Sequence, residues 1–204
     1  MFGQASKERF RCGNQSLMIM PTAYTMPRGS SYFTDSELFI IQYTYALTNT
    51  THISGGMIFP LSTELYQSFS VGVKQNYLQS GPLQSALWFG YNPSFHGALL
   101  GNVISLGDNN ASLHAATAWG TDFKEITHDY VVMVGGMISL SPSLSAILEG
   151  LSTSETINDN GDGLITAGLR FNGSNINCDV GGARFLSNKS VSAWLPIVKV
   201  NFQF

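Results

Sequence analysis

Charged side chains make up only 11% of this chain of 204 residues, so the few that stand inside regularly patterned segments are the first candidates for chemistry. Each candidate occupies the polar face of a segment in which apolar and polar residues alternate, a pattern that puts successive side chains on opposite faces of a strand. The candidates are Lys74, Glu149, Arg170, Asp179 and, if a β-bulge lies near Gly181 and Gly182, Arg184.

Basic and acidic groups on one shared face can neutralise one another as a buried network, or they can select solutes by charge. The network is the favoured interpretation, because an unpaired charge in a narrow interior is costly. It predicts that Glu149 and Arg170, which share a face on neighbouring segments, form an ion pair inside the fold. The charge filter stays open as the alternative.

A second grouping, residues 158–163, alternates carboxylates and amides around a turning glycine, as calcium-binding loops do. The closing glutamate of such a loop is absent, because Leu164 to Gly168 contains no acid. An acidic, glycine-rich turn has the same composition for conformational reasons alone. The sequence therefore predicts no metal site.

A hydrolase with a serine nucleophile would need a histidine beside that serine as its general base. Of the four histidines, His114 lies on the polar face of its segment, while His52, His96 and His128 fall at predicted turns or loops. No Gly-x-Ser-x-Gly motif occurs, and nothing in the sequence brings a nucleophile, a base and an orienting group together. No catalytic residue, enzymatic activity or cofactor is therefore predicted.

The composition narrows the class of protein. Apolar residues reach 44%, yet no run approaches the ~18 to 20 residues of a membrane helix. The net charge of −3 leaves no basic surplus for nucleic-acid phosphates. Few charges with 21 Gly, 13 Phe and 8 Tyr fit a β-barrel that turns apolar residues to lipid and small polar residues inward. Met1 to Arg9 resembles no secretory signal, so a mature or truncated chain is expected, and Cys12 and Cys178 are predicted to be free thiols.

Period-2 segments separated by turn residues recur along the chain, and no helical period persists over three turns. They predict an all-β fold, an antiparallel transmembrane β-barrel of about twelve strands, with ten to fourteen left open. Residues 1–15 would form an N-terminal periplasmic segment and 16–204 a single barrel domain. The predicted strands are 16–26, 34–47, 51–59, 67–78, 83–92, 97–106, 111–120, 127–140, 144–152, 163–172, 175–186 and 190–204.

Short and long connections alternate, and this alternation places both termini on the short-turn, periplasmic side. The segment 27–33 is predicted at the opposite end. The closing strand, Val198 to Phe204, is predicted to pair with Leu17 to Thr25, with Lys199 among the residues that turn inward. The predicted short turns are 48–50, 79–82, 107–110, 141–143, 172–174.

The terminal aromatic residue, Phe204, resembles the C-terminal sorting signal of bacterial outer-membrane β-barrels. From about Met20 onward the chain is similar to uncharacterised outer-membrane β-barrel proteins of Bacteroidota, in PTAYTMPRGSSYF, FIIQYTYALT, FSVGVKQNYL, SAILEGLS, LITAGLRFNGSNINCDVGGARF and WLPIVKVNFQF. The resemblance implies a fold and a location only: the cell outer membrane, with its lipid and the barrel-assembly machinery as partners. It implies no biochemical activity.

Together these features predict a structural or passive channel barrel with a narrow or plugged polar lumen, open at most to small solutes. The alternative is a soluble β-barrel or sandwich that binds a small apolar ligand. The direction of Val71, Leu169, Val200 and Phe202 separates the two, since these side chains face lipid in the first and an enclosed core in the second.

Overall fold

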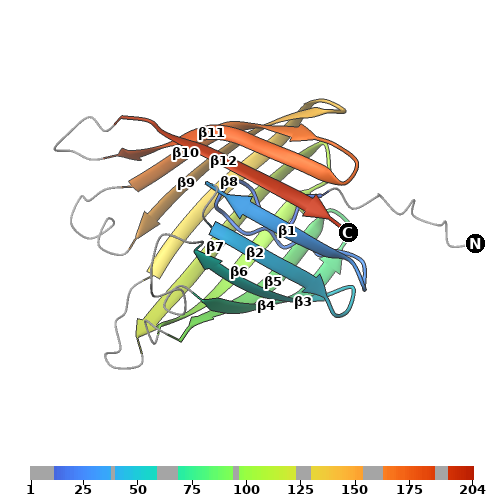
Figure 1. The fold of residues 1–204 in the computed structure, drawn as a ribbon, viewed down its shortest axis with the longest axis vertical. Helices are drawn as coiled ribbons and strands as arrows, with labels where there is room; N and C mark the ends of the chain where they lie inside the picture. Colours follow the sequence, from blue (N-terminus) through green and yellow to red (C-terminus); the bar gives the residue numbers. More distant parts are fainter. Residues whose placement is uncertain are drawn as a thin grey trace, which may run out of the picture.

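Twelve antiparallel strands close into a barrel (Figure 1). The computed structural model describes residues 12–37, 40–58, 69–93, 97–122, 130–153, 163–186 and 193–204. The strands are β1 (Ser31–Ser36), β2 (Ile40–Ala46), β3 (Thr51–Ile58), β4 (Ser70–Ser80), β5 (Leu83–Asn92), β6 (Gly97–Gly107), β7 (Ala111–Asp122), β8 (Tyr130–Ser141), β9 (Leu144–Thr153), β10 (Gly163–Asn172), β11 (Ile176–Leu186) and β12 (Leu195–Gln203). The predicted closed barrel of twelve strands is thereby confirmed. None of the described residues forms a helix long and apolar enough to cross a membrane.

Each strand pairs with its neighbours in sequence, and β1 pairs with β12 to close the ring. Closure leaves no unpaired sheet edge, which a barrel in hydrocarbon requires. The C-terminus lies at the same end of the barrel as five connections of two to four residues, and this end is called here the short-turn end (Figure 1). These connections are 47–50, 81–82, 108–110, 142–143 and 173–175.

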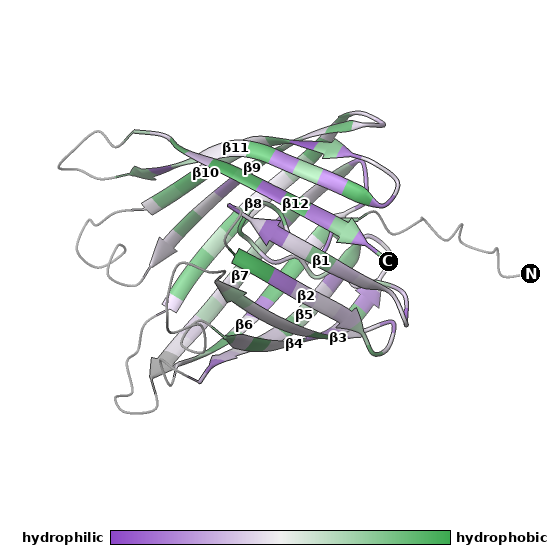
Figure 2. Ribbon diagram, viewed as in Figure 1, coloured by the Kyte–Doolittle hydropathy of each residue, from purple (hydrophilic) through white to green (hydrophobic). Residues whose placement is uncertain are grey.

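The barrel turns its apolar residues outward. Val71 is 42% exposed and Leu169 is 39% exposed, while Arg170, the neighbour of Leu169, is fully buried inside. Val200 and Phe202 lie on the same outward face as Val198, which is also exposed. The alternation is visible as green and purple bands along the strands in Figure 2. The soluble alternative is therefore wrong, because its apolar side chains would face an enclosed core.

The first predicted strand, 16–26, is wrong. This segment contains one isolated bridge, between Ser16 and Pro21, and no strand. Pro21 lacks the N–H that a central strand needs, which the alternating pattern around it concealed. The count of twelve survives because the predicted strand 34–47 divides: Glu37, with a φ of 58°, turns the chain between β1 and β2.

Residues 12–26 instead fold back inside the barrel, and we call them the inserted hairpin. Leu17 N–H donates to the Met20 carbonyl at 2.8 Å, and Thr22 N–H donates to the Gln15 carbonyl at 3.1 Å, so the chain reverses at 17–20. Three buried apolar residues form this tip: Leu17, Met18 and Met20. Residues 12–15, predicted to lie outside the barrel domain, are part of this buried hairpin.

The inserted hairpin enters from the short-turn end. Its base connects to residues 27–30, where Arg28 N–H donates to the Asn49 side chain of the β2–β3 turn at 2.8 Å. The prediction that 27–33 lies at the opposite end is therefore wrong. The closing strand β12 also pairs with β1 rather than with Leu17 to Thr25, and Phe33 lies opposite Phe202 in the register.

Candidate functional site: the lumen and its inserted hairpin

The lumen wall holds the inserted hairpin by its backbone. Lys74 on β4 lies on one side, and its Nζ donates to the carbonyl oxygens of Gln15 at 3.2 Å, Thr22 at 3.2 Å and Tyr24 at 2.9 Å. An ammonium group has three donors, so the three carbonyls saturate it. The strand places Lys74 there because Val71 and Val73 on the opposite face point outward.

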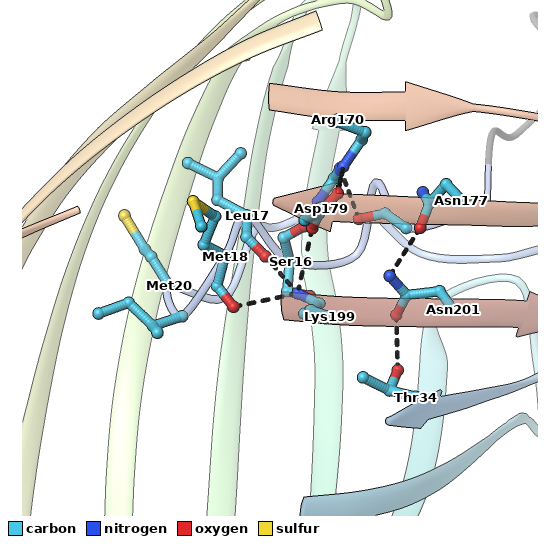
Figure 3. A network of polar contacts seen from close by, with 12 residues as sticks. Ser16, Leu17, Met18, Met20, Thr34, Arg170, Asn177, Asp179, Lys199 and Asn201 are labelled. Atoms are coloured by element: carbon cyan, nitrogen blue, oxygen red, sulfur yellow. Dashed lines mark hydrogen bonds and ion pairs between the residues drawn. The ribbon is translucent and has the colours of Figure 1, made fainter. Parts of the chain in front are cut away.

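Across the lumen, Arg170 on β10 and Asp179 on β11 form a bidentate ion pair (Figure 3). Arg170 Nε and Nη2 each lie 2.7 Å from a carboxylate oxygen of Asp179, and both side chains are fully buried. The guanidinium also donates to the carbonyls of Gly13 and Ser16, both at 2.9 Å. One side chain therefore serves an ion pair and the hairpin at once.

Lys199 on β12 makes a third attachment (Figure 3). Its Nζ donates to Ser16 Oγ at 2.7 Å, to the Met18 carbonyl at 3.2 Å and to the Leu17 carbonyl. The same nitrogen lies 3.9 Å from Asp179 Oδ2. The sequence pattern predicted that Lys199 turns inward, but nothing in it singled the residue out as part of the network.

Glu149 on β9 provides the complementary acceptor. Its carboxylate accepts the backbone N–H of Met20 at 2.9 Å and of Ile19 at 3.2 Å, and also the hydroxyl of Thr166. The predicted ion pair between Glu149 and Arg170 is wrong. Arg170 stands directly opposite Asp179 in the β10–β11 register. Glu149 stands opposite Thr166, which lies four residues before Arg170 on β10.

Arg184 does not join this group. The β10–β11 register runs without a shift from Gly163 to Asn172, so no bulge turns Arg184 inward. Arg184 stands opposite Ile165, whose neighbour Thr166 carries the inward hydroxyl that Glu149 accepts. Arg184 therefore belongs to the outward face of β11.

A chain of hydrogen bonds between polar side chains joins β1, β12 and β11 beside the ion pair of Arg170 and Asp179 (Figure 3). Thr34 on β1 donates to Asn201 on β12 at 2.6 Å, and Asn201 donates to Asn177 on β11 at 2.7 Å. Asn177 then donates to the carbonyl of Cys12 in the hairpin. The first and last strands and the hairpin are thus connected through one chain of hydrogen bonds.

The two described histidines also face the lumen. His114 contacts Ser105 through Nδ1 at 2.7 Å and Ser112 through Nε2 at 2.9 Å, which ties β6 to β7. Ser105 Oγ also accepts the N–H of Ala23 in the hairpin at 2.8 Å. His52, predicted at a turn, is a buried residue of β3 and accepts the Met26 N–H through Nε2 at 2.8 Å.

Apolar packing holds the tip of the inserted hairpin. Leu17, Met18 and Met20 belong to a buried cluster with inward residues of the wall. An ideal Cβ at Gly168 would lie 2.8 Å from Met18 Sδ, so the absence of a side chain there makes room for the tip. The wall residues of the cluster are Ala86, Val103, Ala116, Met133, Met137 and Ile147.

The inserted hairpin leaves part of the short-turn mouth open. A hollow of about 860 Å³ lies between the hairpin and the turns of that end. Uncharged polar side chains dominate its lining, among them Asn14, Asn49, Gln79, Gln84 and Asn109.

Other candidates from the sequence do not enter the site. The segment 158–163, whose composition resembles that of a calcium loop, lies outside the described residues except for Gly163, and so do His96 and His128. Within the described part of the chain, no three His, Cys, Asp or Glu side chains come together as metal ligands. Both cysteines are free.

Comparison with known proteins places the fold among porins. The KdgM porin, solved in complex with disordered oligogalacturonate, superposes with a TM-score of 0.60 at 9% identity, over 86% of this chain and 96% of KdgM. A membrane protein solved in a study of in-meso crystallisation gives a TM-score of 0.57 at 9% identity, over 86% and 83% of the two chains. The Pseudomonas aeruginosa protein OccK10 gives 0.45 at 12% identity, over 81% of this chain and 58% of its own. No protein-family model and no curated protein matches the sequence.

The class of protein follows from the closed barrel, its apolar exterior and its polar interior. The chain is a porin-like transmembrane β-barrel with the fold of outer-membrane channels. The inserted hairpin occupies the lumen of this barrel.

Proposed function

We propose that the protein is a passive channel of the outer membrane, which the inserted hairpin keeps closed and which conducts small solutes when the hairpin leaves. The observation that carries this proposal is how the wall charges are satisfied. Lys74 donates to three hairpin carbonyls, and Glu149 accepts two hairpin N–H groups, so neither charge is satisfied by the wall alone. Once the hairpin leaves, these groups need water, and a hydrated polar lumen is what a passive channel provides.

Many individually weak contacts attach the inserted hairpin to the wall, so the hairpin can detach while the barrel stays folded. A hydrogen bond to a charged group contributes roughly 1.5–3 kcal/mol and a neutral one about 1 kcal/mol. The barrel itself depends on the strand ladders and their closure, which do not include residues 12–26. Changes confined to the hairpin are therefore expected to open the lumen without unfolding the wall.

Single-channel recording in planar bilayers tests this. The release variant combines Gly13→Val with Met20→Asn. A Cβ at Gly13, where φ is +85°, would overlap the Asn177 side chain, and an amide at position 20 would enter the apolar cluster. The matched control is Ile19→Asn, because Ile19 is a tip residue that is 43% exposed.

We expect frequent, long-lived current steps from the release variant, and none or only brief ones from the wild type and Ile19→Asn. Heat-modifiable gel migration shows that all three proteins hold a folded barrel. Equal conductance of a folded wild type and a folded release variant would contradict the proposal that the hairpin closes the lumen.

We also propose that the chain belongs to the Bacteroidota type of outer-membrane barrel and is inserted into lipid by the barrel-assembly machinery through its last strand. The terminal aromatic Phe204, 76% exposed at the short-turn end, supports this. Phe204→Gln is expected to lower the amount of heat-modifiable barrel in outer-membrane fractions several-fold. An unchanged amount of heat-modifiable barrel would show that Phe204 has no role in assembly.

A further inference from the structure

Three nitrogen-bearing side chains form a row across the inner face of β3, β4 and β5. His52 stands directly opposite Lys74 in the β3–β4 register, and Lys74 stands directly opposite Trp88 in the β4–β5 register. Directly opposed residues on antiparallel strands have Cβ atoms about 4.5–5.5 Å apart. We call these three residues the donor row.

No acid among the described residues neutralises the charge of the donor row. Among the described residues no carboxylate lies within 4.0 Å of Lys74, whereas Arg170 and Lys199 both lie that close to Asp179. The described inward acids, Glu149 and Asp179, stand on β9 and β11, across the ring from β4. The inserted hairpin, residues 12–26, contains no charged residue either.

Two of the donors in the row have no hydrogen-bond partner in the part of the chain that the structure describes. Met26 N–H donates to His52 Nε2, so the ring proton lies on Nδ1, and that buried atom has no hydrogen-bond partner among the described residues. Trp88 Nε1, which can only donate, is buried without a described partner as well. A buried donor left unpaired costs roughly 1–3 kcal/mol, so both N–H groups favour an acceptor that enters the lumen, such as water or an anionic oxygen.

Each strand beside β4 thus carries one open N–H donor in register with Lys74, and an ammonium group together with N–H donors is suited to binding an anion. We propose that the donor row binds anionic oxygens, of a carboxylate or a phosphate, in the open lumen and makes the channel prefer anions. The inference rests on the proposed function for the opening of the lumen. In the closed state the carbonyls of Gln15, Thr22 and Tyr24 occupy Lys74.

The proposal also implies a competition. The hairpin carbonyls that Lys74 binds are neutral, whereas an anionic oxygen adds the Coulomb attraction of an opposite charge. An anion that reaches Lys74 from the lumen therefore competes with the hairpin for the ammonium group. The anion is expected to favour the open state to the extent that it binds only there.

Binding is measured on the full chain in the release background, with Trp119→Phe and Trp194→Phe so that Trp88 is the only tryptophan. Titration with inorganic phosphate, and in a second arm with acetate, is followed by Trp88 fluorescence. We expect a saturable change that Lys74→Gln weakens roughly tenfold or more, which corresponds to one charge-assisted hydrogen bond. The arm with the tighter binding identifies the anion class.

The matched control is Arg28→Gln, which removes an equal charge from an exposed position at the short-turn end. It should leave phosphate affinity unchanged. Absence of a saturable signal with either anion, or equal affinities with and without Lys74, would overturn the anion site whether or not the protein conducts.

Reversal potentials in a KCl gradient separate this inference from the proposed function. A conducting release variant should prefer chloride, and Lys74→Gln should abolish that preference while Arg28→Gln keeps it. A variant that conducts without anion preference contradicts the donor row, whereas one that binds phosphate but never conducts contradicts the channel and leaves the binding site standing.

Discussion

At the scale of single residues, the buried charges have two kinds of partner. Asp179 neutralises Arg170 directly, while Lys74 and Glu149 depend on backbone groups of the inserted hairpin. Sequence reasoning could place Lys74, Glu149, Arg170 and Asp179 on inward faces, because strand alternation alone decides that. It could not assign partners, because opposing residues are set by the register, and the register put Asp179 opposite Arg170.

The ion pair gives the first residue-scale prediction. Asp179→Asn leaves the Arg170 guanidinium buried without a counter-charge, which destabilises a protein by about 3–5 kcal/mol. We expect a lower urea midpoint, measured by loss of the heat-modifiable band. Arg28→Gln, an exposed charge change, should stay within about 0.5 kcal/mol of the wild type. Equal midpoints for the two variants would show that the ion pair contributes nothing.

The Cys12 thiol in the inserted hairpin gives the second residue-scale prediction. Cys12 is 2% exposed, and burial raises the pKa of its thiol from 9.0 to about 11, partly offset by Arg170. A raised pKa keeps the unreactive thiol form up to that pH, so maleimide labelling at pH 7 should be slow. Both proteins carry Cys178→Ser, so that only Cys12 can react, and the release variant should label at least tenfold faster. Rapid labelling of Cys178→Ser with the hairpin otherwise unchanged would contradict the buried position of the hairpin.

At the scale of elements, the inserted hairpin is where sequence reasoning failed. Its alternation resembles a strand, and only Pro21 argued against one. What decides its conformation is a set of side chains from strands far along the chain, such as Ser105, Glu149 and Lys199, which satisfy its backbone in place of a neighbouring strand. No local pattern in residues 12–26 contains that information.

The pairing of β1 with β12, which closes the barrel, is predicted to be its least stable strand pairing, because β1 is short. β1 has six residues, and beyond it Glu37 continues the pairing: its N–H donates to the Val198 carbonyl, and its carboxylate accepts the Val198 N–H, both at 2.8 Å. Glu37→Ala should raise hydrogen-exchange rates in β1 and β12 several-fold, because it removes the acceptor. Glu37→Gln retains an acceptor and should exchange more slowly than Glu37→Ala. Identical rates in the two variants would exclude a role for the side chain.

At the scale of the whole molecule, the barrel was predictable because its signal repeats. Twelve segments each carry an apolar outward face, and scarce charges leave no soluble exterior, so errors at the first strand did not change the fold class. The state of the lumen was not predictable in the same way. It depends on one segment of the chain folding into the interior, which adds no strand and changes no outward residue.

We propose that the inserted hairpin closes a lumen that the barrel would otherwise leave conducting. Single-channel current through the wild type and through Gly13→Val/Met20→Asn, recorded on the same day in the same bilayer lipid, tests it most directly. Sustained steps are expected only in the variant, with Ile19→Asn behaving as the wild type does. Sustained steps of the same size in all three folded proteins would contradict it.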